Sequence, residues 1–170
     1  MNAITPHRGW TLVECLTATT IIALLAGTAV PQLNHWIADT QQRNTLRAIL
    51  SACRLARDVA LSRRQIVTLC SSSDLIQCDQ HWGHQLIVFT DKNKNEAVDA
   101  HDEILKIVQL PEQYCLELHA SANKQFLQFK PSGLSNGTAG NIHFCEPTQG
   151  QNDQKIVVSL GGRSTIRNMN

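Results

Sequence analysis

The sequence predicts an α+β fold in which one long N-terminal helix packs on a β-rich, largely antiparallel globular head. Two patterns lead to this prediction. Apolar residues recur at helical spacing through the first third of the chain, and from residue 65 onward short runs rich in Val, Ile and Phe alternate with turn residues. The connections between those runs are too short for helical crossovers, so the strands are expected to pair antiparallel.

The first segment of the predicted helix, residues 10–30, is an apolar run of 21 residues. At a rise of about 1.5 Å per residue it spans roughly 30 Å, the thickness of the hydrocarbon core of a bilayer. Only nine residues precede it, with His7 and Arg8 as its cationic flank. The positive-inside rule therefore places the N-terminus in the cytoplasm and the head across the membrane, so the run is predicted to be a single-pass transmembrane helix.

Residues 31–64 are predicted to continue the helix as an amphipathic segment. Pro31 lacks an N–H donor and is expected to kink the helix where this segment begins. Beyond it, apolar residues at three- and four-residue spacing predict a stripe that packs on a sheet. The stripe consists of Leu46, Ile49, Leu50, Cys53, Ala56, Val59 and Ala60. Arg43, Arg47 and Arg54 fall on another side, which is typical of a solvated face.

The head, residues 65–170, is predicted to be a single domain of short strands separated by turns. The strands are expected at 66–70, 85–90, 103–109, 114–119, 125–129, 141–144, 155–160 and 164–167. Turns are indicated by Pro131-Ser132-Gly133, Asn136-Gly137 and Gly161-Gly162. The length of about 140 residues after the apolar run is enough for one domain and its core.

Charge and motifs give no indication of an enzyme. The chain of 170 residues has a formal net charge of +1, which lacks the strong positive footprint of a nucleic-acid-binding surface. It contains no Gly-x-Ser-x-Gly elbow, no His-Glu-x-x-His pair and no phosphate loop, and its seven histidines are scattered. We therefore expect no catalytic residues, no cofactor and no metal site.

One acidic residue, Glu14, lies inside the apolar run, one turn from its N-terminal edge. A carboxylate in lipid costs on the order of 2.5–3.5 kcal/mol and usually has a partner. No Lys or Arg lies between Trp10 and Gln42, so the nearest cation would be an α-amino group created by a cut just before Trp10. A plain membrane anchor leaves Glu14 unexplained, and a conventional signal peptide cut near 26–29 has a shorter apolar core.

The residues around that point resemble a known processing signal. Arg-Gly-Trp-Thr-Leu-Val-Glu at 8–14 resembles the class III signal of type IV pilins and type II secretion pseudopilins, with Trp10 where phenylalanine is more usual. The resemblance implies that residues 1–9 are a leader, and that prepilin peptidase cuts between Gly9 and Trp10 and methylates the new N-terminus. It also implies that Glu14 pairs with the ammonium group of a neighbouring subunit during assembly. Pro31 falls where many pilins carry a helix-bending proline.

One motif in the amphipathic helical segment and several in the head resemble the GspH/FimT branch of minor pilins and pseudopilins. They are Leu-Ala-Arg-Asp-Val-Ala at 55–60, Val-Thr-Leu-Cys at 67–70, Trp-Gly-His-Gln-Leu-Ile-Val-Phe-Thr-Asp at 82–91, Asp-Glu-Ile-Leu at 102–105, Phe-Lys-Pro-Ser-Gly at 129–133, Ile-His-Phe-Cys at 142–145 and Ile-Val-Val-Ser at 156–159 before Gly-Gly-Arg. The resemblance implies a low-abundance filament subunit, placed near the tip, with its anchor in the bacterial inner membrane and its head in the periplasm. The implied partners are prepilin peptidase, other pilins or pseudopilins and the inner-membrane assembly platform.

A second function, DNA binding during uptake, is a hypothesis of its own. Some DNA-binding members of this branch end in a motif resembling Gly-Arg-x-Arg, and here Thr165 occupies the place of the second arginine. Arg163 and Arg167 are four residues apart, so both would project from one face of a terminal strand. Their alternative role is to keep an edge strand soluble. Further candidate contacts to DNA phosphates are Lys124, Lys130 and Lys155.

Of the six cysteines, Cys15 lies in the apolar run, where it is a small apolar residue. The other five would face an oxidising compartment, where disulfides persist. Cys70 and Cys78 close a short loop and are the favoured bridge. A zinc site built from these two thiols with His81 and His84 is disfavoured, because a disulfide competes for the same sulfur atoms. The pairing of the remaining cysteines is left open; they are Cys53, Cys115 and Cys145.

The stretch 91–102 resembles the start of a calcium loop. It offers oxygen ligands at alternate positions from Asp91, and Asp102 stands at the twelfth position. The sixth position, which needs glycine for its sharp turn, is Glu96. A polar hairpin between the flanking strands is therefore the favoured interpretation, and weak metal binding is left open.

Overall fold

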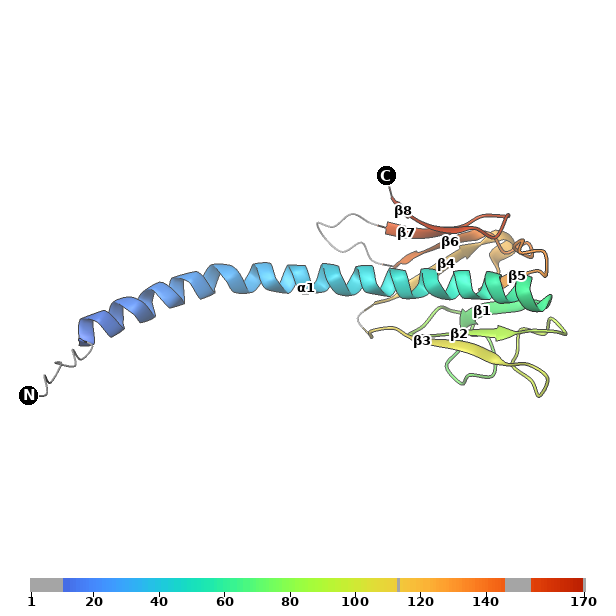
Figure 1. The fold of residues 1–170 in the computed structure, drawn as a ribbon, viewed down its shortest axis with the longest axis horizontal. Coiled ribbons are helices and arrows are strands. Elements are labelled where there is room, and N and C mark those ends of the chain that lie inside the picture. Colours follow the sequence, from blue (N-terminus) through green and yellow to red (C-terminus); the bar gives the residue numbers. More distant parts are fainter. Residues whose placement is uncertain (1–10, 113, 146–153, 170) are drawn as a thin grey trace, which may run out of the picture. The chain divides into compact units, whose positions relative to one another are not determined.

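A computed structural model describes residues 11–112, 114–145 and 154–169, and in this part of the chain one long helix precedes eight strands (Figure 1). The elements are α1 (Leu12–Arg63), β1 (Val67–Ser71), β2 (Gln85–Thr90), β3 (Ile104–Gln109), β4 (Leu116–Ala120), the short 3-10 helix η1 (Ser121–Asn123), β5 (Phe126–Phe129), β6 (Gly140–Phe144), β7 (Gln154–Val158) and β8 (Ser164–Asn168). The predicted α+β class is confirmed, and each predicted strand corresponds to an observed one with ends that differ by no more than two residues.

The chain divides into two compact units, residues 1–41 and 42–170, and α1 contributes to both. In the described part of the first unit, large apolar side chains are exposed: Leu12, Val13, Leu16, Ile21, Ile22, Leu24, Leu25, Leu33, Trp36 and Ile37. No helix among the described residues is both long enough and apolar enough to cross a bilayer, so the predicted span over 10–30 is not confirmed. The predicted leader, with Gly9, and Trp10 lie outside the described residues.

The predicted kink at Pro31 is not tested. The helical backbone of α1 continues through position 31 without a break, and the Pro31 side chain lies outside the described part of the chain. The kink therefore stays a prediction.

In the second unit, the C-terminal half of α1 lies at the centre of the hydrophobic core. The predicted stripe is buried at six positions, and Val59 is half-buried. The buried members are Leu46, Ile49, Leu50, Cys53, Ala56 and Ala60. Arg43, Arg47 and Arg54 are exposed, as expected for a solvated face.

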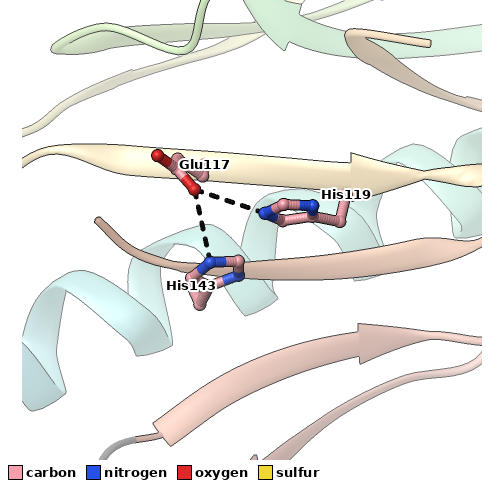
Figure 2. Close-up of side chains that lie close together, drawn as sticks. All are labelled: Glu117, His119 and His143. Carbon is pink, nitrogen blue, oxygen red and sulfur yellow. Dashed lines mark hydrogen bonds and ion pairs between the residues drawn. The ribbon is translucent and has the colours of Figure 1, made fainter. Parts of the chain in front are cut away.

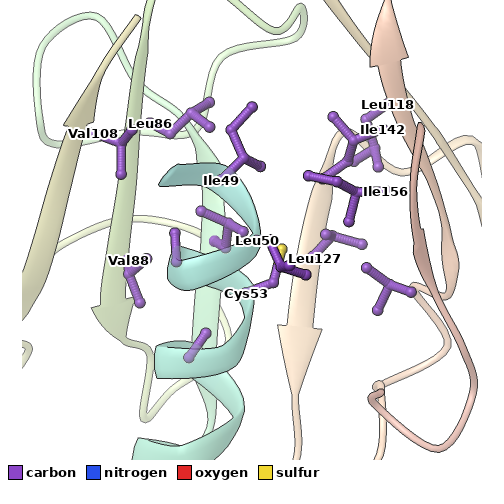
Figure 3. Close-up of a cluster of buried hydrophobic side chains, with 14 of the residues drawn as sticks. Ile49, Leu50, Cys53, Leu86, Val88, Val108, Leu118, Leu127, Ile142 and Ile156 are labelled. Carbon is purple, nitrogen blue, oxygen red and sulfur yellow. The ribbon is translucent and has the colours of Figure 1, made fainter. Parts of the chain in front are cut away.

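Two four-stranded antiparallel sheets pack against this half of the helix. The first has the order β3-β2-β1-β5 and the second the order β4-β6-β7-β8. Figure 3 shows the helix residues between the two sheets. The first sheet contributes Leu86, Val88, Val108 and Leu127, and the second contributes Leu118, Ile142 and Ile156. The predicted antiparallel pairing is confirmed, and the separation of the strands into two sheets was not predicted.

β1 is buried on both faces. One face packs on α1, and the other carries a second apolar cluster made of Cys70, Ile87, Phe89 and Phe126. Two long loops cover this cluster, because Leu75 and Val98 reach over it from the connections before β2 and β3. The first sheet therefore lies between α1 on one face and the two loops before β2 and β3 on the other.

The connection 91–103 is a polar loop that joins β2 to β3, which agrees with the favoured interpretation of the calcium-like stretch. The buried carboxylate of Asp91 accepts hydrogen bonds from Thr68 Oγ1 at 2.9 Å, from Gln128 Nε2 at 3.1 Å and from the backbone N–H of Asn95 at 3.1 Å. Asp102 accepts a hydrogen bond from the backbone N–H of Lys92 at 3.2 Å. Both acids therefore already bind donors of the protein.

Two disulfides brace the head. Cys70 is joined to Cys78, the favoured pair, and Cys115 is joined to Cys145, a pairing that the sequence left open. The Cys70–Cys78 bridge uses both of the thiols that the disfavoured zinc site would need. The second bridge ties the start of β4 to the end of β6. Cys53 is a free thiol in the core.

Candidate functional site

α1 begins with a reciprocal contact between Thr11 and Glu14. The Thr11 hydroxyl accepts a hydrogen bond from the backbone N–H of Glu14 at 3.3 Å, and Glu14 Oε2 accepts one from the backbone N–H of Thr11 at 3.5 Å. Thr-x-x-Glu is the spacing of a capping box, which satisfies donors that the first turn of a helix leaves unpaired. A carboxylate at this end also complements the helix dipole.

The capping box gives Glu14 a local role that the sequence analysis missed. The signal that could have found it is the Thr-x-x-Glu spacing at the start of an apolar run. The Glu14 side chain is exposed and its contact with Thr11 is long, so the carboxylate keeps lone pairs that can accept from a further cation. The predicted source of that cation, an amino group on Trp10, lies outside the described residues.

The five basic residues proposed to contact DNA do not all lie on one sheet. Lys155 on β7 pairs with Arg167 on β8, and Arg163 precedes β8, so these three belong to the second sheet. Lys124 lies two residues before β5, with its Nζ 4.8 Å from the centre of the Phe126 ring, and Lys130 directly follows β5. Both therefore flank a strand of the first sheet. This division gives the DNA-binding hypothesis no support.

A different polar cluster lies on the outer face of the second sheet (Figure 2). Glu117 and His119 are alternate residues of β4, and His143 on β6 is paired with Glu117, so the three side chains share one face. Glu117 Oε2 lies 3.2 Å from His119 Nε2 and 3.5 Å from His143 Nε2. The two imidazole rings are stacked, with centres 4.6 Å apart and planes 12° from parallel.

The surroundings of His143 favour its neutral form. Partial burial is the largest cause that lowers the pKa of the His143 imidazole, and nearby His119 is the second. Glu117 acts in the opposite direction, and Lys155 on the neighbouring strand β7 adds to the lowering. A neutral imidazole has a free nitrogen lone pair, so the cluster can coordinate a cation as well as share protons.

Sequence reasoning missed this cluster because its histidines are 24 positions apart. The alternation Glu-Leu-His at 117–119 indicates two polar side chains on one face of a strand. Only the β4–β6 register places His143 opposite Glu117.

Residues 45–162, well over half of the chain, match the family model described as Type II transport protein GspH. The chain belongs to the GspH family. The GspH match runs from the buried half of α1 through β7, so it covers every strand of the first sheet and β4, β6 and β7 of the second. It confirms the resemblance to the GspH/FimT branch. Among curated proteins, no sequence is significantly similar to this chain.

Solved structures share the fold of the GspH chain. The type IV minor pilin FimU of Pseudomonas aeruginosa matches with a TM-score of 0.55 at 15% identity, over 78% of this chain and 92% of FimU. The minor pseudopilin EpsH from the type II secretion system of Vibrio cholerae matches with a TM-score of 0.51 at 12% identity, over 76% of this chain and 94% of EpsH. At these identities the likeness establishes the pilin-like fold.

Proposed function

We propose that this GspH-family chain is a minor pilin or pseudopilin that enters a type IV pilus or a type II secretion pseudopilus through the N-terminal part of α1. The observation that carries the proposal is the exposed apolar surface of that helical segment, which runs from Leu12 to Ile37 and begins beside Glu14. Large exposed apolar surfaces mark contacts with lipid or with other proteins. Neighbouring apolar helices in a filament would cover this surface.

The steps that precede assembly follow from the first 30 residues. Prepilin peptidase cuts between Gly9 and Trp10 and methylates the new N-terminus. The apolar run 10–30 then holds the subunit in the inner membrane as a single-pass anchor, with its head in the periplasm, until the assembly platform moves it into a filament near the tip. The 21-residue length of the run and the cationic flank ahead of it support this order of events.

Glu14 is the docking group in this proposal. A carboxylate in an apolar surrounding is costly unless it meets a cation. The capping contact with Thr11 offers it only an amide N–H. The ammonium group on Trp10 of a neighbouring subunit would add the missing positive charge. The capping box would hold the carboxylate at the helix start, where such a neighbour could reach it.

Three substitutions separate docking from capping. Glu14→Gln keeps an acceptor at the third helical position and removes the charge, because glutamine also completes a capping box. Glu14→Leu removes both, and Thr11→Val removes the capping hydroxyl but keeps the charge. We expect both Glu14 variants to be depleted from sheared filaments, and Thr11→Val to be incorporated nearly as well as the wild-type chain.

The readout is the ratio of filament to membrane protein, measured by immunoblot in cells that produce the other subunits. Intact-mass measurement of the membrane protein should first show a methylated N-terminus at Trp10. An uncut chain, or a start near Val30, would contradict the processing step. Wild-type incorporation of Glu14→Gln would limit Glu14 to a capping role.

A further inference from the structure

We propose that Glu117, His119 and His143 form a binding site for a divalent transition-metal ion such as Zn²⁺, with two imidazole nitrogens and one carboxylate oxygen as ligands. Among the described residues, these three form the one group of potential ligands whose donor atoms all lie within 4.8 Å of one another. This site is independent of the filament role proposed above, because none of its residues lies in the first unit of the chain.

The sheet brings the three ligands together without help from a loop. Glu117 and His119 stand two positions apart on β4, and His143 lies opposite Glu117 on β6. The Cys115–Cys145 disulfide joins the same two strands two residues away from this pair. Ligands that project from a cross-linked strand pair lose little conformational freedom on binding, which favours a well-defined site.

The two distances from the carboxylate to the imidazoles are close to those around a coordinated ion. A tetrahedral ion with bonds of about 2.0–2.2 Å holds neighbouring ligand atoms roughly 3.3–3.6 Å apart. Glu117 Oε2 lies 3.2 Å from His119 Nε2 and 3.5 Å from His143 Nε2. The nearly parallel imidazole rings must turn so that their lone pairs converge on one ion. The side chain of His119 is 62% exposed, which leaves it room to turn.

The charges around the site suit a dication. Glu117 supplies one negative charge that attracts a cation, and a neutral imidazole offers a nitrogen lone pair to a metal. Lys155 opposes binding, because its positive charge lies near His143. Two histidines and one carboxylate are the ligand set of open zinc sites and also suit nickel and copper, whereas calcium and magnesium prefer oxygen ligands.

The coordination by this chain is incomplete. Three protein ligands leave at least one position of a tetrahedral ion to water or to a group from outside. Glu117 and His119 also line a cavity of about 550 Å³ at the edge of the second sheet that β4 forms, together with His81 and Trp82. A small ligand or an incoming side chain can therefore approach the open position.

Titration with Zn²⁺ tests the proposal. The full chain, purified in detergent without an affinity tag and carrying Cys15→Ser to remove the exposed thiol, is titrated by calorimetry at neutral pH. We expect one equivalent to bind. Each of Glu117→Gln, His119→Gln and His143→Gln should weaken binding by more than about tenfold. Ring nitrogen NMR shifts of two histidines should change on addition of the ion.

His84→Gln is the matched control, because His84 is an exposed histidine outside the cluster. It should bind Zn²⁺ like the parent chain. Thermal unfolding without metal establishes that each variant is folded, and the exposed Glu117 and His119 positions tolerate substitution even where His143 does not. Absence of stoichiometric binding, equal binding by the His119→Gln/His143→Gln double variant, or an equal loss in His84→Gln would overturn the proposal.

Discussion

The Cys53 thiol lies in the core where α1 meets both sheets (Figure 3). Burial raises its pKa to about 12, and the hydroxyl of Ser164 opposes this shift only in part. The thiolate is the reactive form of cysteine, so Cys53 is inert towards oxidants and disulfides while the head is folded. Cys53, the free cysteine of the second unit, is therefore a packing residue.

This pKa difference predicts a loss of stability at high pH. Below about pH 9 the thiol is protonated in both the folded and the unfolded chain and contributes no pH dependence. Between about pH 9 and pH 12 the unfolded chain releases the proton and the folded chain keeps it, so this group lowers the free energy of unfolding by up to about 1.4 kcal/mol per pH unit. The free energies of unfolding of the wild-type chain and of Cys53→Ala, measured in urea, should therefore become more similar as the pH rises from about 8 to about 10.5. If the stabilities of the two chains changed in parallel with pH, the raised pKa of Cys53 would be contradicted.

At the scale of elements, the carbonyl group of Gly133 is a contact point between α1 and two turns of the head. Arg57 Nε on the helix donates a hydrogen bond to the carbonyl oxygen of Gly133 at 3.1 Å. Gly162, in the turn between β7 and β8, has a φ of +73°, and a Cβ built there would lie 2.0 Å from the same oxygen. Only glycine lets the two turns approach this closely.

Gly162→Ala should therefore destabilise the head. Alanine at this position would be strained by the positive φ, and its Cβ would clash with the backbone of Gly133. We expect the free energy of unfolding to fall by more than about 2 kcal/mol. Gly161→Ala is the neighbouring control, because its Cβ would meet nothing closer than Ser159 Oγ at 3.8 Å. That variant should stay within about 0.5 kcal/mol of the wild-type chain. Thermal unfolding followed by circular dichroism gives both values, and equal stability of the two variants would refute the docking role of Gly162.

At the scale of the whole molecule, the described buried side chains of α1 all lie in its C-terminal part. In the described part of the helix, the first buried side chain is that of Gln42, and the large apolar side chains before it are exposed. The head therefore contains its own core, whereas the described part of the first unit leaves its large apolar side chains exposed.

Removal of the first 38 residues tests this division. A chain that begins at Asp39 keeps one turn of helix ahead of Gln42 and loses most of the exposed apolar surface. We expect it to dissolve without detergent and to unfold with a free energy within about 1 kcal/mol of the full chain, because the removed residues include none of the described buried side chains. Light scattering and urea unfolding provide the measurements. Loss of cooperative unfolding would show that the head depends on the first unit.

Local pattern was enough to predict the elements of the head. The three- and four-residue spacing from Leu46 to Ala60 identified the buried stripe of α1, and runs of β-branched and aromatic residues between turn signals located all eight strands. The favoured disulfide joins Cys70 and Cys78, which are only eight residues apart, so the sequence could predict it too. The GspH match confirms the family that the quoted motifs resemble.

The sequence by itself determined the order of the helix and strands, the buried helix stripe and the family, because each depends on residues close together in the chain. The tertiary structure alone decided the separation into two sheets, the Cys115–Cys145 bridge and the position of His143 opposite Glu117. Each of these depends on which strands become neighbours. The alternation within one strand shows which side chains share a face, but it carries no information about the strand that will lie beside it.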